Sequence, residues 1–189
     1  MKRRTWTGHV FIATSVDGYI ADPNGNLEWL TDPPAETRHA PAHYGEDVPA
    51  GYDEFTAGVS HLVMGRGTYE KVLSFDRWPY ESFHVVVMST TLPRTEDDRI
   101  AVVASVTEAC SALEADEAST VYVDGGQIVS EFLAADLIDA LTITRAPVIL
   151  GKGLPLFHTL PRGIRLLHEG TSTTETGMTS TRYRVDRRN

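Results

Sequence analysis

Three segments of the sequence, each directly after a short apolar run, supply between them glycines, hydroxyl side chains and charged side chains. They are Gly65–Thr68, Ser89–Thr91 and Asp124–Gly126. Glycine lets the backbone approach a ligand closely, Ser and Thr supply short donors, and the guanidinium of Arg66 can bind a phosphate through two nitrogens. A helix that begins after such a segment adds backbone N–H groups that favour an anion. Together the segments predict a site for a phosphate-bearing ligand such as a dinucleotide, although each alone is more often only a turn.

Three carboxylates are candidates for proton transfer to a substrate. Asp124 is favoured because it stands at a predicted strand end beside paired glycines, with a turn cap as the alternative. Asp17 precedes Gly18, and Asp-Gly is also a common turn signal. Glu54 lies in a weak helical pattern over residues 52–59, where it could equally belong to a solvated first turn.

Other common sites are not supported. No G-x-G-x-x-G pattern follows the first apolar run and no Walker A motif occurs, so neither a standard Rossmann site nor an ATP-hydrolysing P-loop is predicted. His39 and His43 have the spacing of two ligands on one helix face, but Pro41 disfavours that helix and no third ligand is near. Cys110 is the single cysteine, which excludes an intramolecular disulfide and a thiolate cluster. We therefore predict no metal site.

The apolar pattern predicts the elements that position these residues. Continuous apolar runs indicate five buried strands, at residues 10–13, 61–64, 84–88, 100–104 and 121–123. Helical patterns lie between several of them, and one begins with the capping-box spacing of Ser105 and Glu108. Strands that alternate with helices are typical of a parallel sheet covered on both faces.

The C-terminal third has a different pattern. Apolar stretches at 141–144, 164–168 and 182–185 follow one another without strong helical periodicity, which is typical of antiparallel strands. We therefore predict an α/β fold with a mixed, mostly parallel sheet, antiparallel C-terminal strands and helices on both faces. The stretch from 22 to 51 is predicted to be a long loop of the kind that forms lids or binding sites.

Length and charge narrow the function further. The 189 residues suit a single domain spanning 1–189, with a sizeable core. The net charge of −9 and the pI near 5.2 argue against a protein that grips nucleic acid or an anionic membrane, because both need a basic face. The apolar run at 10–13 is too short for a signal sequence or a membrane span, so a cytoplasmic location is expected by elimination.

Four motifs in order resemble the dihydrofolate-reductase superfamily. They are Ser15–Ala21, Val63–Glu70, Val121–Gly126 and Leu150–Phe157, and the similarity runs from about Gly8 to Val185. The closer match resembles the branch that contains the C-terminal reductase domain of the bifunctional riboflavin-biosynthesis protein. The resemblance implies the dihydrofolate-reductase-like fold, hydride transfer from NADPH, and a small pyrimidine- or pterin-type substrate such as 5-amino-6-(5-phosphoribosylamino)uracil.

The resemblance also implies roles for particular residues. Ala13 and Ile20 match backbone positions at the nicotinamide carboxamide. Four groups match the phosphate-binding positions. The first two are Gly65, Arg66 and Thr68 in the first loop, and Ser89 and Thr90 at the adenosine 2′-phosphate. The other two are Gly125 and Gly126, which in the family are joined by a cis peptide, and Gln127 and Ile128 at the pyrophosphate. Arg66 as counter-charge of the 2′-phosphate implies NADP over NAD.

The substrate side is less determined by the motifs. Trp29 resembles a lid tryptophan, with a core anchor as the alternative, and Phe55 is the aromatic candidate on the helix of Glu54. The stretch from 22 to 51 differs from both branches, with Arg38 as its only arginine, so dihydrofolate reduction and a non-catalytic nucleotide-binding or assembly module remain alternatives. The resemblance finally implies a homodimer that pairs through C-terminal sheet surfaces near Tyr183.

Overall fold

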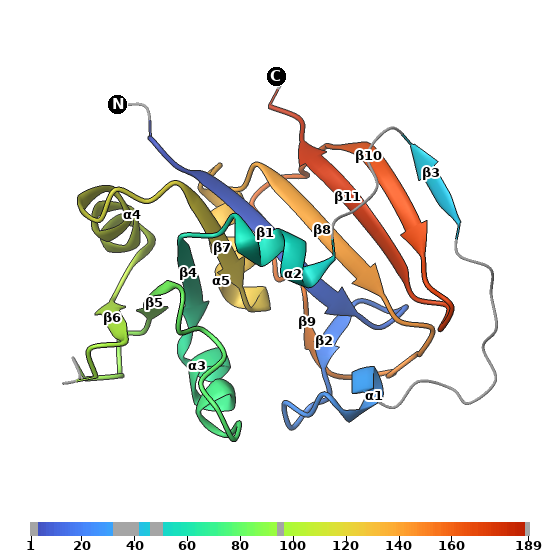
Figure 1. The fold of residues 1–189 in the computed structure, drawn as a ribbon, viewed down its shortest axis with the longest axis horizontal. Helices are drawn as coiled ribbons and strands as arrows, with labels where there is room; N and C mark the ends of the chain where they lie inside the picture. The colour runs from blue at the N-terminus through green and yellow to red at the C-terminus, as the bar shows by residue number, and fades with distance from the viewer. Residues whose placement is uncertain (1–3, 32–41, 46–50, 94–96, 188–189) are drawn as a thin grey trace.

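The structure is a computed structural model, which describes residues 4–31, 42–45, 51–93 and 97–187. These residues form a nine-stranded sheet in the order β3-β10-β11-β8-β1-β7-β4-β5-β6, beside a two-stranded ribbon of β2 and β9 (Figure 1). The ranges of the six parallel strands are β1 Thr7–Thr14, β4 His61–Gly65, β5 His84–Met88, β6 Ile100–Val103, β7 Thr120–Asp124 and β8 Ala140–Arg145.

Helices cover both faces of the parallel half. On one face α4 (Val106–Ala115) and α5 (Gly126–Ala134) bury Leu113, Val129 and Phe132 among strand residues such as Val63 and Val121. On the other face α2 (Tyr52–Ala57) and α3 (Arg66–Leu73) pack Phe55, Tyr69 and Val72 over the alternate strand residues. The period-two alternation of each strand thus feeds two cores, which confirms the predicted fold class.

The C-terminal half of the sheet is antiparallel, as predicted. β10 (Leu166–Thr173) pairs with β11 (Thr179–Val185), and β11 pairs with β8. A short edge strand, β3 (His43–Gly45), then pairs with β10. The strands at β10 and β11 are longer than the predicted 164–168 and 182–185, because their Thr- and Ser-rich halves lack an apolar signature.

The sequence pattern missed the smallest elements. β2 (Tyr19–Ala21) pairs with β9 (Leu154–Pro155), and α1 (Glu28–Thr31) lies within the predicted loop. Elements of two to four residues are too short to show a period. Residues 32–41 and 46–50 of that loop, with Arg38, His39 and Pro41, lie outside the described residues.

The predicted capping box is confirmed at α4. The hydroxyl of Ser105 accepts a hydrogen bond from the amide of Glu108 at 3.2 Å, and the Glu108 carboxylate accepts one from the amide of Ala104 at 3.0 Å. Cys110 on this helix is partly buried and packs against the core. Within the described part of the chain, no helix has the length and apolar character needed to span a membrane.

Candidate functional site

Apart from Asp124, the residues of the three segments singled out in the sequence line one groove at the carboxyl edge of the parallel strands. β7, β4 and β5 are neighbours in the sheet and run parallel, so Asp124, Gly65 and Met88 end them at the same edge. The groove there has a volume of about 440 Å³. We call it the strand-end groove. Leu154 and Pro155 of β9 form a further wall of this groove. The ribbon of β2 and β9, which the sequence pattern did not predict, therefore completes the groove.

Ten of the eleven residues matched to cofactor positions line the strand-end groove. They are Ile20, Gly65, Arg66, Thr68, Ser89, Thr90, Gly125, Gly126, Gln127 and Ile128. The eleventh, Ala13, does not line it: Ala13 lies half-buried in β1, opposite Thr144 of β8. Thr91, which belongs to the Ser89–Thr91 segment but to no matched position, also lines the groove. His158 lines it as well and was not singled out in the sequence, because it belongs to none of the three segments.

Two helices direct uncapped N-termini at this groove. Gly65 and Gly125 are the N-cap residues of α3 and α5, and neither helix has a side-chain hydrogen bond at its cap. At α4, by contrast, the hydroxyl of the N-cap residue Ser105 accepts a hydrogen bond from the first-turn amide of Glu108. The first-turn N–H groups of α3 and α5 therefore remain available to an anion, with the helix dipoles in its favour.

Arg66 is held at the rim of the groove. Its Nε donates to Oε1 of Glu70 at 2.6 Å, and its Nη1 donates to Oγ1 of Thr91 at 2.7 Å. The side chain of Arg66 remains 47% exposed. Ser89 organises the same corner, since its hydroxyl accepts hydrogen bonds from the amides of Thr91 and Leu92. Of the described residues that line the groove, Arg66 is the only arginine or lysine.

The paired glycines are required by packing. Gly125 has a φ of 89°, where an L side chain is strained, and a Cβ on Gly126 would lie 2.2 Å from the carbonyl oxygen of Pro155. The prediction of a cis peptide bond between the two glycines is wrong, because the described residues contain no cis peptide bond. The left-handed φ of Gly125 by itself turns the chain from β7 into α5.

Asp124 lies half-buried at the end of β7, next to Gly125 of the groove, but is not itself one of the residues that line the groove. It accepts a hydrogen bond from the amide of Gly125 at 2.9 Å, and no ion pair to it occurs among the described residues. Burial raises the pKa of Asp124 to about 6, although the Gly125 hydrogen bond acts in the opposite direction. Burial and then the charge of Asp124 also raise the pKa of Tyr52, so the carboxylate faces the α2 side of the sheet.

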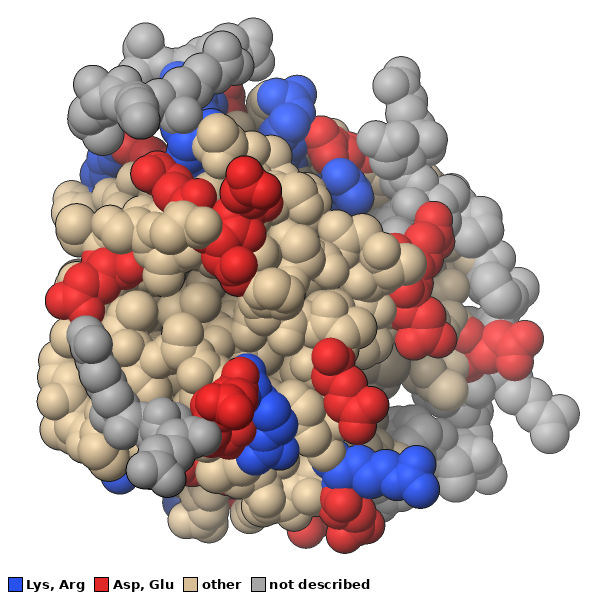
Figure 2. Space-filling view, turned by 60° about the vertical axis from the view of Figure 1, so that its left-hand side comes forward, with Lys and Arg blue, Asp and Glu red and all other residues tan. Residues whose placement is uncertain are grey.

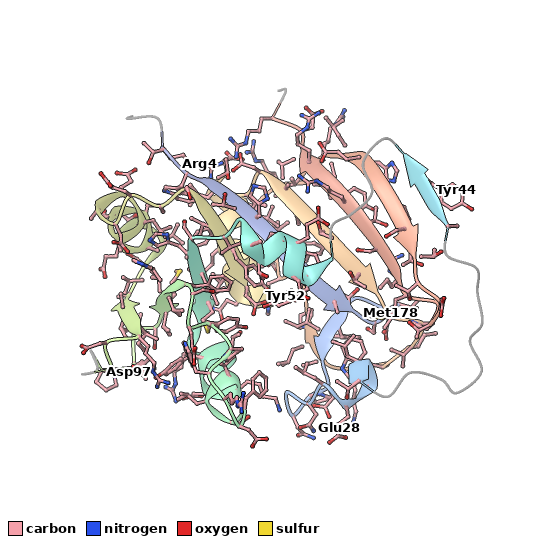
Figure 3. The ribbon with its side chains drawn as sticks, in the orientation of Figure 1. Arg4, Glu28, Tyr44, Tyr52, Asp97 and Met178 are labelled. Carbon is pink, nitrogen blue, oxygen red and sulfur yellow. The ribbon has the colours of Figure 1, made fainter. Side chains whose placement is uncertain are left out.

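Aromatic side chains form a wall on that side. Phe55 stacks on Phe11 with ring centroids 4.9 Å apart and meets the edge of Tyr122 at 5.2 Å. Tyr52, labelled at the start of α2 in Figure 3, packs against Phe11 in the middle of β1. Phe55, a predicted substrate contact, is thus part of this wall, and Tyr52 was missed because a lone tyrosine carries no positional signal.

Asp17 and Glu54 do not line the groove. Asp17 accepts hydrogen bonds from the Ser15 hydroxyl at 2.7 Å and from the amides of Leu150 and Gly151 at 3.1 and 2.7 Å. The Ser15 hydrogen bond, followed by the two backbone ones, holds the pKa of Asp17 below its usual value despite some desolvation. These contacts favour the turn interpretation of Asp17. Glu54 lies exposed on α2.

Trp29 lies on α1 and is half-buried. Its Nε1 is shielded from solvent and has no hydrogen-bond acceptor among the described residues. A buried N–H without an acceptor is costly, so this atom is available to an acceptor from outside the described chain.

This architecture matches the sequence model of a known protein family. The model of the RibD C-terminal domain matches residues 7–179, which include the strand-end groove and every strand before β11. The chain belongs to the RibD C-terminal domain family. This confirms the resemblance seen in the four motifs.

Proteins similar to this RibD C-terminal domain include one relative of known sequence and two solved structures. An uncharacterized protein of Bacillus subtilis (strain 168), YwjB, is 33% identical over 175 residues, which span 90% of this chain and 92% of YwjB. A crystal structure from Shewanella sp. PV-4, whose name assigns it to riboflavin biosynthesis, is 37% identical with a TM-score of 0.80, covering 96% of this chain and 99% of that one. Dihydrofolate reductase from Enterococcus faecalis, solved with NADP(H), shares the fold alone: TM-score 0.59, 17% identity, 95% and 96% coverage.

Proposed function

We propose that the protein is an NADPH-dependent reductase that reduces a small pyrimidine- or pterin-type substrate, in the manner of 5-amino-6-(5-phosphoribosylamino)uracil reductases. The observation that supports it most is the convergence of Arg66, Ser89 and the Gly125–Gly126 pair on one groove. Membership of a riboflavin-pathway reductase family supports the same class of reaction.

The residues of the strand-end groove fit a dinucleotide. Uncapped N-termini of α3 and α5 offer backbone donors to a pyrophosphate, and Arg66 with Thr91 offers charge and a hydroxyl to a 2′-phosphate at the end of β5. The groove volume of about 440 Å³ lies within the usual range for ligand sites. NADPH bound there would supply the hydride; the protein supplies orientation and a proton.

Asp124 is the residue we assign to proton transfer. A carboxyl group with a pKa of about 6 exchanges its proton near neutral pH, which suits donation to a ring nitrogen beside the reduced carbon. The aromatic wall of Phe55 and Tyr52 would exclude water and stack on a flat heterocycle beside it. Glu54, exposed on α2, provides no specific support for dihydrofolate reduction.

The experiment is a calorimetric titration of NADPH and NADH against the wild type and two arginine variants. Arg66→Gln should weaken NADPH binding about tenfold or more and leave NADH binding nearly unchanged, because only NADPH has the 2′-phosphate. Arg162→Gln is the matched control: Arg162 is 50% exposed against 47% for Arg66, but pairs with Asp136 outside the groove. No NADPH binding by the wild type at millimolar concentration would refute the proposed function.

A further inference from the structure

A second cavity, of about 550 Å³, lies at the opposite end of β4 and β5 from the strand-end groove. His61 begins β4, His84 begins β5, and the parallel register pairs these two histidines directly. Asp116, the C-cap residue directly after α4, joins them at the cavity wall. We call these three residues the His–Asp cluster.

The ligand atoms of the His–Asp cluster converge. Nε2 of His61 lies 3.0 Å from Oδ2 of Asp116, and Nδ1 of His84 contacts the same oxygen. All three atoms lie within 4.8 Å of one another. Tetrahedral Zn²⁺ with bonds of about 2.0–2.1 Å separates its ligand atoms by about 3.4 Å. The two histidines would exchange their hydrogen bonds to Asp116 for bonds to the ion, and side-chain rotation of Asp116 and His84, which are 51% and 65% exposed, can adjust the spacing.

The third member, His61, is held rigidly. Its side chain is 4% exposed, and its Nδ1 is hydrogen-bonded to the hydroxyl of Ser60 at 2.9 Å. Ser60 is itself bonded to the amide of Ser119 and the carbonyl oxygen of Thr120. A second partner of this kind orients a metal-bound imidazole, so Nε2 of His61 is directed at the cluster before any ion arrives.

The charge around the cluster favours a cation. Asp116 supplies one negative charge, and Glu81 and Asp98 line the same cavity, where Arg99 is the opposing cation. Acidic side chains are spread across the face of the molecule shown in Figure 2. Two imidazoles and one carboxylate are a donor set for Zn²⁺ and similar ions, whereas Mg²⁺ and Ca²⁺ prefer oxygen ligands.

We propose that the His–Asp cluster binds one divalent transition-metal ion of the Zn²⁺ type. His61, His84 and Asp116 occupy three coordination positions, and the fourth opens to the cavity and takes water. The ion joins the starts of β4 and β5 to the end of α4. This site is separate from the strand-end groove and does not depend on the proposed reductase activity.

The test is a calorimetric titration of ZnCl₂ into the full, tag-free protein near neutral pH. All metals are removed from the protein beforehand. The expected result is one ion per chain, with affinity reduced about tenfold or more in His84→Ala and in Asp116→Asn. His168→Ala is the matched control, because His168 is an exposed histidine on β10, near the opposite edge of the sheet. The Zn²⁺ affinity of this variant should equal that of the wild type. MgCl₂ should give no binding.

Two further measurements serve as controls for this titration. Circular dichroism checks that the variants fold, which is expected because both substituted side chains are exposed. A saturating excess of Zn²⁺ should raise the Tm of the wild type by about 5 °C or more and leave that of His84→Ala unchanged. Absence of one-to-one binding in the wild type, or undiminished binding in both cluster variants, would overturn the proposal.

Discussion

Asp124 shows how a single side chain is placed at the expense of stability. Its carboxylate ends β7 half-buried, with one backbone hydrogen bond and a pKa raised to about 6 from an ordinary value of 3.8. An acid with a raised pKa in the folded state binds more protons folded than unfolded between these two values. Stability therefore declines as pH rises through that interval and stays lower above it.

We expect Asp124→Asn to be more stable than the wild type at pH 7, by about 2 kcal/mol, since each pKa unit corresponds to about 1.4 kcal/mol and partial exposure reduces the effect. The asparagine retains an oxygen for the Gly125 amide. Urea unfolding across a pH series measures this, and the gain should vanish below the ordinary pKa of an aspartate. Glu54→Gln, at an exposed position, should follow the wild type; a constant gain at every pH would contradict the assigned cause. Reductase activity, if present, should fall in Asp124→Asn.

At the scale of elements, the junction between β7, α5 and β9 forms the rear of the strand-end groove. Gly126 begins α5 directly against the backbone of Pro155, and Ser130 one turn later bonds to the carbonyl of Gly126 and the amide of His158. The helix and the ribbon are therefore packed without room for a side chain between them.

Gly126→Ala should be strongly destabilising, by about 3 kcal/mol or more, because its Cβ would meet the Pro155 carbonyl at 2.2 Å. Gly67→Ala is the matched control: Gly67 lies in α3, and a Cβ added there would have open space within 4 Å, so alanine should be neutral or stabilise by about 0.5–1 kcal/mol. Thermal unfolding of both variants provides the comparison. Equal stability of the two would show that β9 yields to the helix at little cost.

The strands and helices around the groove also show which parts of the site could be predicted from the sequence. Gly65–Thr68, Ser89–Thr91 and Asp124–Gly126 were predictable as neighbours because parallel strands place their carboxyl ends at one edge. β2 and β9 were not, since ribbons of two or three residues have no periodicity. The His–Asp cluster was also hidden: His61 and His84 meet only through the β4–β5 register, which no local pattern encodes.

At the scale of the whole molecule, the two halves of the sheet are covered differently. Figure 1 shows helices over the parallel strands, whereas no described helix lies in front of β10 and β11. Residues of β11 are mostly half-buried, and Glu169 bridges Arg182 and Arg184 across the two strands. A second copy of the chain on this surface remains a prediction from family resemblance.

We expect light scattering at micromolar concentration to give about twice the chain mass of 20.8 kDa. Tyr183→Glu, on β11, should then shift the mass toward that of one chain, because a charge placed at a two-fold contact meets its own copy. Glu175→Lys, in the turn between β10 and β11, serves as the control and should not change the mass. A wild-type mass near 20.8 kDa would contradict the pairing.

The Asp17 carboxylate joins the end of β1 to the amides of Leu150 and Gly151, residues more than 130 positions later in the chain. Just beyond them β9 pairs with β2 and forms the wall of the strand-end groove. A fragment cut before residue 150 would keep the six parallel strands yet lose this wall. If the proposed function holds, nucleotide affinity should consequently emerge only once β9 has paired with β2, so that ligand capture would report the closure of this ribbon.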